Sequence, residues 1–344
     1  MSLRRTALDA ASALLHGAGI FRFIHQRLLG GNISVLMYHG LVAAPLPVPD
    51  PCFLRVDSFK RQMEYLARNF EVMHLEEALA LRHRVARPLA CVTFDDGFSS
   101  VHNLALPILK HFRIPATVYL VTDLIDSDQT LWFARLHQAI CETSATEVRV
   151  GDLRFSLSGQ AERAVASAWL QRVLKLLDRA EFSSALNDLL IQLGAREADG
   201  TVPWEPFRIL NSDQIRSMSR DGLVRFGAHT ATHQILTRTT PDDAQREIER
   251  SVAAVATLVD LPSRSFAYPN GGPGDFDAAV IEVIRRAGIE YALSTITGPV
   301  GSDADCYAIP RYHVGDYPLA RFAALVHHGH HVVREINRAF GTIN

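Results

Sequence analysis

Two groups of polar residues, far apart in the chain, have the types and spacing of a hydrolytic metal site. Asp95 and Asp96 are adjacent and follow the apolar run 88–94. His229 and His233 are four residues apart and follow a second run of this kind. Like charges repel and burial makes a carboxylate harder to ionise, so two aspartates at the end of a buried strand require a compensating charge. Two imidazoles and one carboxylate can hold a divalent cation and leave one coordination position open for water.

Such a site would explain why two carboxylates stand side by side. One aspartate would ligate the cation, whose charge also keeps the neighbouring carboxylate ionised, and the other would act as a general base on water. The simpler interpretation of the pair is a turn, because Asp-Gly is a common turn sequence. Two histidines at this spacing are weak evidence for a metal by themselves, so the hypothesis depends on the combination with the aspartates.

These side chains must be positioned by secondary structure, and the sequence alternates apolar runs with segments of helical spacing. Short, apolar, β-branched runs predict strands at 33–40, 71–75, 88–94, 114–122, 223–229, 264–269 and 291–296. Apolar residues at helical spacing predict helices at 57–70, 99–112, 241–259 and 276–288. Strands that alternate with helices imply an α/β fold with a parallel sheet, either open or closed into a barrel.

One segment, residues 124–206, breaks this alternation. It contains helical patches and the pattern of a small hairpin at 147–157. We expect a mostly helical insertion over one end of the barrel, where it serves as scaffold or covers the substrate, because functional loops gather at the carboxyl ends of strands. The barrel would span residues 32–316, between an N-terminal amphipathic helix at 1–31 and a C-terminal helix at 317–344.

The composition argues against several classes of protein. A chain of 344 residues that is 48% hydrophobic can bury a large core, and its net charge of −2 without basic clusters argues against nucleic-acid binding. The four cysteines form no CxxC pair, which favours a reducing compartment. No run reaches about 18 uninterrupted apolar residues, so a membrane span is not expected.

The N-terminal segment has a pattern of its own. Asp9 and His16 interrupt the apolar run that follows Arg4 and Arg5, and no clear cleavage site follows, so the segment does not predict a signal peptide. Residues 1–31 instead have the pattern of an amphipathic helix, which packs against the protein or lies on an anionic membrane surface. We expect a cytoplasmic protein with peripheral contact to the inner membrane through this segment.

Three motifs in this order resemble the NodB-type polysaccharide deacetylases, carbohydrate esterase family four. They are TFDDGF (93–98), HTATH (229–233) and FAYPNG (266–271), and the resemblance runs from about residue 33 to 315. YHG (38–40) and IPR (309–311) match features of one bacterial, envelope-associated branch. The resemblance implies a distorted (β/α) barrel that hydrolyses N-acetyl groups of amino sugars with a metal. The implied substrate is a polysaccharide or a lipid-linked saccharide precursor in exopolysaccharide or envelope biosynthesis.

The resemblance also assigns roles to residues. Asp95 would be the general base, and Asp96, His229 and His233 would be the metal ligands. Zn²⁺ suits this ligand set, with Co²⁺ or Ni²⁺ as alternatives. The expected partner is an N-acetylated glycan.

The third motif departs from the family pattern, which is usually R-x-P-Y-G. Here Ala267 stands where the arginine that orients the catalytic aspartate is expected. Arg311, after a late strand, is our candidate for that guanidinium, whereas Arg264 is nearer in sequence but lies deeper in its strand. The backbone N–H of Asn270 keeps its place as an oxyanion donor, because a change of side chain does not remove it.

The residue that protonates the leaving amine stays open. The family's late L-x-H motif is matched by Leu325-Val326-His327, in a segment with helical pattern. His39 and His313, each near the end of a predicted strand, are its rivals. Trp132 and Phe133 are either core residues or a stacking platform for a sugar ring.

Three other functions use the same residues. One is a glycan-binding barrel without turnover, which the missing arginine favours and the complete Asp-His-His set opposes. A second is a hydrolase of non-sugar amides. A third is an Fe(II) oxygenase with a facial triad, but those enzymes have an H-x-D pair on a jelly roll, whereas this chain alternates strand and helix.

Overall fold

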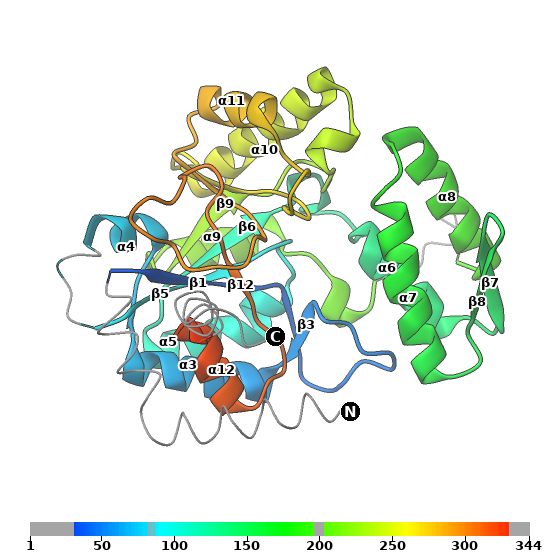
Figure 1. Ribbon diagram of the computed structural model, residues 1–344, viewed down its shortest axis with the longest axis horizontal. Coiled ribbons are helices and arrows are strands. Elements are labelled where there is room, and N and C mark those ends of the chain that lie inside the picture. Colours follow the sequence, from blue (N-terminus) through cyan, green and yellow to red (C-terminus); the bar gives the residue numbers. More distant parts are fainter. Residues whose placement is uncertain (1–30, 82–83, 85–86, 196–202, 330–344) are drawn as a thin grey trace, which may run out of the picture.

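A parallel sheet forms the centre of the protein, whose computed structural model describes residues 31–81, 84, 87–195 and 203–329 (Figure 1). The eight strands of this sheet are β1 (Ile33–Tyr38), β4 (Glu71–Val72), β5 (Leu89–Phe94), β6 (Ala116–Leu120), β9 (Val224–Ala228), β10 (Ser265–Ala267), β11 (Tyr291–Leu293) and β12 (Tyr312–His313). Their order is β11-β10-β9-β6-β5-β1-β12, with β4 beside the start of β5, and all these pairings are parallel. The predicted parallel α/β sheet is thus confirmed.

The two edges of the sheet are joined by one late segment of the chain. Ile309 forms a parallel bridge with Leu293 of β11, at one edge. Three residues later, Tyr312 pairs with Leu36 of β1, near the other edge. The sheet therefore curls into the distorted barrel that was expected, and residues 309–313 close it.

Helices bury the outer faces of the strands. All residues of β1 and β5 are buried, as expected for parallel strands that are covered on both sides. The helices of the barrel are α3 (Val56–Asn69), α4 (Leu75–Leu81), α5 (Leu106–Phe112), α9 (Ser212–Ser219), α10 (Pro241–Val259), α11 (Ala278–Arg286) and α12 (Leu319–Val326). In Figure 1, α3, α5 and α12 lie on the opposite side of the sheet from α10 and α11. None of the helices in the described residues is long and apolar enough to cross a membrane.

The segment after β6 forms a mainly helical insertion beside the barrel (Figure 1). It contains α6 (Trp132–Glu142), a hairpin of β7 (Glu147–Val150) and β8 (Leu153–Ser156), α7 (Gln160–Leu174) and α8 (Arg179–Gln192). The insertion has a small hydrophobic core of its own. A second cluster joins it to the barrel, because Phe133 of α6 packs in one cluster with Phe53, Phe98 and Phe207.

The short elements were not predicted. They are β2 (Gly40–Val42) and β3 (Phe53–Arg55), which pair in parallel, 3-10 turns at Thr122–Leu124, Glu205–Phe207 and Leu236–Arg238, and a π-helical turn at Val101–Ala105 before α5. Helix α9 was also missed, since eight residues give no clear periodicity. The late strand expected near Arg311 and His313 is β12, but it covers only Tyr312–His313, so Arg311 precedes this strand instead of following it. Within the expected C-terminal helix, α12 covers Leu319–Val326. Residues 330–344 and the expected helix at 1–30 lie outside the described residues.

Candidate metal and hydrolytic site

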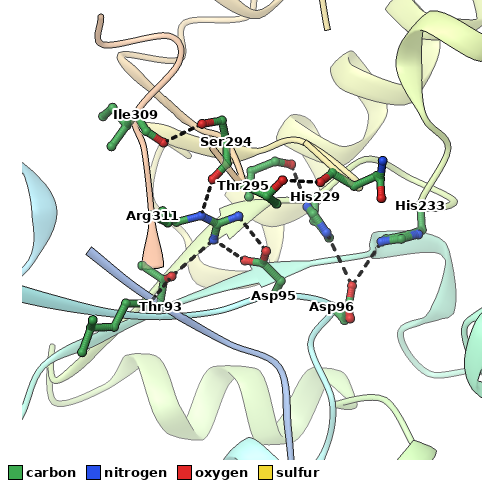
Figure 2. Close-up of polar contacts among 12 residues, drawn as sticks. Thr93, Asp95, Asp96, His229, His233, Ser294, Thr295, Ile309 and Arg311 are labelled. Atoms are coloured by element: carbon green, nitrogen blue, oxygen red, sulfur yellow. Dashed lines mark hydrogen bonds and ion pairs between the residues drawn. The ribbon is translucent and has the colours of Figure 1, made fainter. Parts of the chain in front are cut away.

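Asp96, His229 and His233 meet at the carboxyl end of the sheet, where β5 and β9 end on either side of β6 (Figure 2). The Nε2 atoms of His229 and His233 lie 3.5 and 3.2 Å from the same oxygen, Asp96 Oδ1. One potential ligand atom from each of the three residues lies within 4.8 Å of the other two. The structure thus brings together the three residues that the sequence predicts as a ligand set.

The carboxylate of Asp96 has the surroundings of a metal ligand. It is buried, and neither of its oxygens accepts a hydrogen bond from the described part of the chain. A buried carboxylate without such partners is costly unless a cation compensates it. His229 Nδ1 donates to the carbonyl oxygen of Ala267 at 2.6 Å, which leaves Nε2 facing Asp96. This donor set therefore fits a divalent cation.

The backbone at these positions adopts an unusual conformation. Asp96, Thr230 and His233 have φ values of 74°, 64° and 63°, in the left-handed region that non-glycine residues rarely enter. Such a conformation costs about 1–3 kcal/mol at each residue and persists only where the surrounding structure imposes it. Strain of this kind therefore falls on two of the three ligand residues and on the turn between the histidines.

A buried glutamate of α10 holds the turn that carries the two histidines. The carboxylate of Glu247 accepts hydrogen bonds from the backbone N–H of Thr232 at 2.8 Å and from its hydroxyl at 2.7 Å. Glu247 was not predicted as a site residue from the sequence. Its signal is an acid on the buried face of the helix, between Ala244 and Ile248.

The second aspartate, Asp95, is held by an arginine instead of by histidines. Arg311 donates to both oxygens of Asp95, with N–O distances of 2.7 and 2.8 Å, and its side chain is fully buried (Figure 2). Its Nε donates to the carbonyl of Ser294 at 2.8 Å, and it also contacts the hydroxyl of Thr93 at 3.3 Å. Burial raises the pKa of Asp95, but the guanidinium outweighs this effect and the net pKa lies below the usual value. Asp95 is therefore ionised.

Of the two arginines considered for this position, only Arg311 faces Asp95. It lies in the segment that closes the barrel, directly before β12. Arg264 is at the surface and pairs with Glu290 at 2.5 Å. At the position of the family's usual arginine, Ala267 ends β10, and its carbonyl is the partner of His229.

Asn270 lies in a turn that leaves its backbone N–H free. Its φ is 60°, its side chain donates to Asp275 at 2.6 Å, and its carbonyl accepts from the hydroxyl of Thr295 at 2.7 Å. No acceptor for its backbone N–H is found among the described residues. The N–H is thus available to a ligand.

The three candidate proton donors occupy two different places. His39 and His313 follow or end the paired strands β1 and β12, and their rings are 6.0 Å apart. Burial lowers the pKa of His313 to about 4, and the charge of His39 adds to this effect. His327 instead lies between α12 and α3, where it contacts Phe70 and lies 3.1 Å from the hydroxyl of Tyr65.

The two aromatic residues at the start of α6 also differ. Phe133 is buried in the cluster that joins insertion and barrel, and its ring is 5.6 Å from that of His233. Trp132 is half-buried and meets Phe182 edge to face at 5.2 Å. Phe133 is therefore a core residue beside the ligand set, whereas part of Trp132 is accessible.

A family model described as polysaccharide deacetylase matches residues 83–154 and 158–292. No significant match was found among curated protein sequences.

Several solved structures share the fold. The deacetylase PplD of Streptococcus pyogenes, solved in complex with acetate, has a TM-score of 0.56 at 15% identity, covering 86% of this chain and 97% of its own. A polysaccharide deacetylase from Bacillus cereus has a TM-score of 0.57 at 17% identity, covering 86% and 69%. IcaB from Ammonifex degensii has a TM-score of 0.54 at 19% identity, covering 85% and 97%.

Proposed function

This chain belongs to the polysaccharide deacetylase family, and on that basis we propose that it removes N-acetyl groups from an amino-sugar glycan with the help of a divalent cation. One observation carries the proposal: a buried ligand set of Asp96, His229 and His233 stands directly beside Asp95, a carboxylate that Arg311 holds by both oxygens. A ligand set next to a base is the arrangement that metal-assisted hydrolysis requires.

Each group of the site has a task in this reaction. Asp96, His229 and His233 would hold a divalent cation, which would supply a Lewis acid for the acetyl carbonyl and for the attacking water. Asp95 takes the proton of the attacking water, since each oxygen keeps a lone pair beyond the one used by Arg311. Arg311 fixes the orientation of this carboxylate, and the free N–H of Asn270 donates to the developing oxyanion.

We assign protonation of the leaving amine to His39. A proton donor must carry its proton at working pH, and His313 with a pKa of about 4 is neutral there. His39 directly follows β1 and lies beside His313, with the two rings 6.0 Å apart. His39→Gln is expected to lower kcat by about 10² or more and His313→Gln by less. Equal losses in the two variants would contradict the assignment.

Zn²⁺ is the proposed cation, because two imidazoles and a carboxylate suit it well. Reconstitution of the metal-free protein with Zn²⁺, Co²⁺ or Ni²⁺, followed by activity measurements, ranks the three. A preference for Co²⁺ or Ni²⁺ would replace this part of the proposal.

The cellular setting is proposed from the sequence pattern alone. We propose a cytoplasmic enzyme that acts on an exopolysaccharide or lipid-linked precursor and contacts the inner membrane through residues 1–31. Binding of the full chain to anionic vesicles, compared with neutral vesicles, tests the membrane contact. No binding to anionic vesicles would remove it.

The central test is release of acetate from N-acetylated oligosaccharides by the Zn²⁺-loaded protein and by Asp95→Asn. We expect a metal-dependent rate that falls by about 10²–10⁴ in the variant, the usual contribution of a general base. Equal background rates would favour a glycan-binding barrel without turnover. Release of acetate from simple N-acetyl amides at the same rate would favour a hydrolase of non-sugar amides.

A further inference from the structure

A pocket between the insertion and the barrel leads directly away from the metal ligands. It has a volume of about 50 Å³ and lies between the start of the α7–α8 connection, at Lys175, and the chain after His233. Arg238 lines both this pocket and a wider recess of about 590 Å³ beside it. We refer to the pocket and the recess, which share Arg238, as the groove, and its inner end is at His233.

The charge of the inner pocket is positive. Lys175 of the insertion and Arg238 of the barrel both line it, and it has no carboxylate among its lining residues. Neither cation makes a salt bridge or a side-chain hydrogen bond within the described parts of the chain.

The acids of the wider recess are already occupied by partners. Asp178 caps α8 by accepting from two backbone N–H groups at 2.9 Å, and Glu181 completes this capping box. Asp243 accepts from Thr240 and Arg246 and lies 3.8 Å from Arg179 of the insertion. Each of these carboxylates therefore has partners of its own, and none of them forms a salt bridge with Lys175 or Arg238 among the described residues.

Apolar rings complete the inner pocket. Trp132 and Phe182 of the insertion line it together with the two cations. Aromatic surfaces of this kind pack against sugar rings, while Lys and Arg bind carboxylate or phosphate oxygens. The lining thus combines a surface for a sugar with a site for an oxyanion.

We propose that this groove is a subsite for an anionic sugar unit, in which Lys175 and Arg238 together bind a carboxylate or phosphate next to the N-acetyl sugar at the metal. This rests on the proposed function and narrows its substrate to acidic glycans or phosphorylated saccharides. Because one cation comes from the insertion and one from the barrel, the insertion determines the substrate and is more than scaffold.

The test compares kcat/KM for three substrates: neutral chitooligosaccharides, oligosaccharides that alternate N-acetylglucosamine with glucuronate, and N-acetylglucosamine linked to a diphosphate. Wild type is expected to prefer an anionic substrate by about tenfold or more, the contribution of a charge-assisted hydrogen bond. Preference for the second substrate identifies a carboxylate, and preference for the third identifies a phosphate. No preference for either would overturn the proposal.

The variants are Lys175→Met and Arg238→Gln, with Arg172→Gln as matched control, since Arg172 stacks on Trp169 and does not line the groove. Each groove variant should lose about tenfold in kcat/KM on the anionic substrate and change little on the neutral one. Equal losses on both substrates, or a like loss in the control, would overturn the subsite.

Binding separates this inference from the proposed function. Calorimetric titration of Zn²⁺-loaded Asp95→Asn with the same saccharides measures affinity without turnover. Tighter binding of an anionic saccharide, lost when Lys175→Met is added, supports the subsite even if no acetate is released. Equal affinity for neutral and anionic saccharides overturns it even if the enzyme is active.

Discussion

The two adjacent aspartates at the end of β5 have opposite surroundings. Both oxygens of Asp95 are bonded to Arg311, whereas the oxygens of Asp96 accept no hydrogen bond from the described residues and face two imidazoles. The protein itself thus provides the positively charged partner of Asp95, whereas the positively charged partner of Asp96 would be a cation from solution. Two like charges one residue apart are tolerated because their compensation comes from two different sources.

The largest expected loss of stability comes from breaking the buried ion pair between Arg311 and Asp95. Arg311→Met leaves Asp95 buried without its partner and should lower the free energy of unfolding by about 3–5 kcal/mol. Denaturant unfolding of the metal-free protein measures this. Adding Asp95→Asn to Arg311→Met should restore part of the loss, since the uncompensated charge is then gone. Arg264→Met, at an exposed pair, is the control, and a loss no greater than in this control would contradict the comparison.

Metal removal tests the other aspartate. Free Zn²⁺ at 1,000 times its dissociation constant should stabilise the wild type by about 4 kcal/mol, and chelation should reverse this. Asp96→Asn should no longer respond to metal, while Asp95→Asn should respond as the wild type does. Thermal unfolding with and without Zn²⁺ measures the difference. An equal change of thermal stability on adding Zn²⁺ in the two variants would show that the two aspartates do not have different roles.

The smallest expected effect concerns the turn that carries the histidines. Glu247→Gln should cost about 1–3 kcal/mol of stability, because the hydrogen bonds to Thr232 lose their charged acceptor. Metal affinity should fall about 10- to 100-fold, as is usual when the support of a ligand is altered. Glu249→Gln, exposed on the same helix, is the control. Unchanged Zn²⁺ affinity in Glu247→Gln would show that the turn holds its shape without it.

Sequence patterns predicted Asp96's surroundings better than Asp95's. The apolar run before Asp95, the spacing of His229 and His233 and the alternation of strand and helix predicted both the parallel barrel and the ligand set. Arg311 was a candidate only because the usual arginine was missing. It precedes a strand of two residues, too short for a periodic signal, and its contact with Asp95 depends on how the sheet closes.

The groove was beyond prediction for a related reason. The helices of the insertion have a recognisable sequence pattern. That Lys175 and Arg238 line the same pocket, however, depends on how the insertion packs against the barrel. Packing of this kind is tertiary and leaves no local trace in sequence spacing.

Closure of the barrel by residues 309–313 also affects the order in which the contacts of the site form during folding. This segment is synthesised long after β1, the strand with which it pairs. Such a contact of high sequence separation forms slowly. Until this contact forms, Asp95 lacks its guanidinium partner, so a chain in which only residues 309–313 are still unpaired would lack an oriented base. The proposed activity would therefore appear only when this long-range contact has formed.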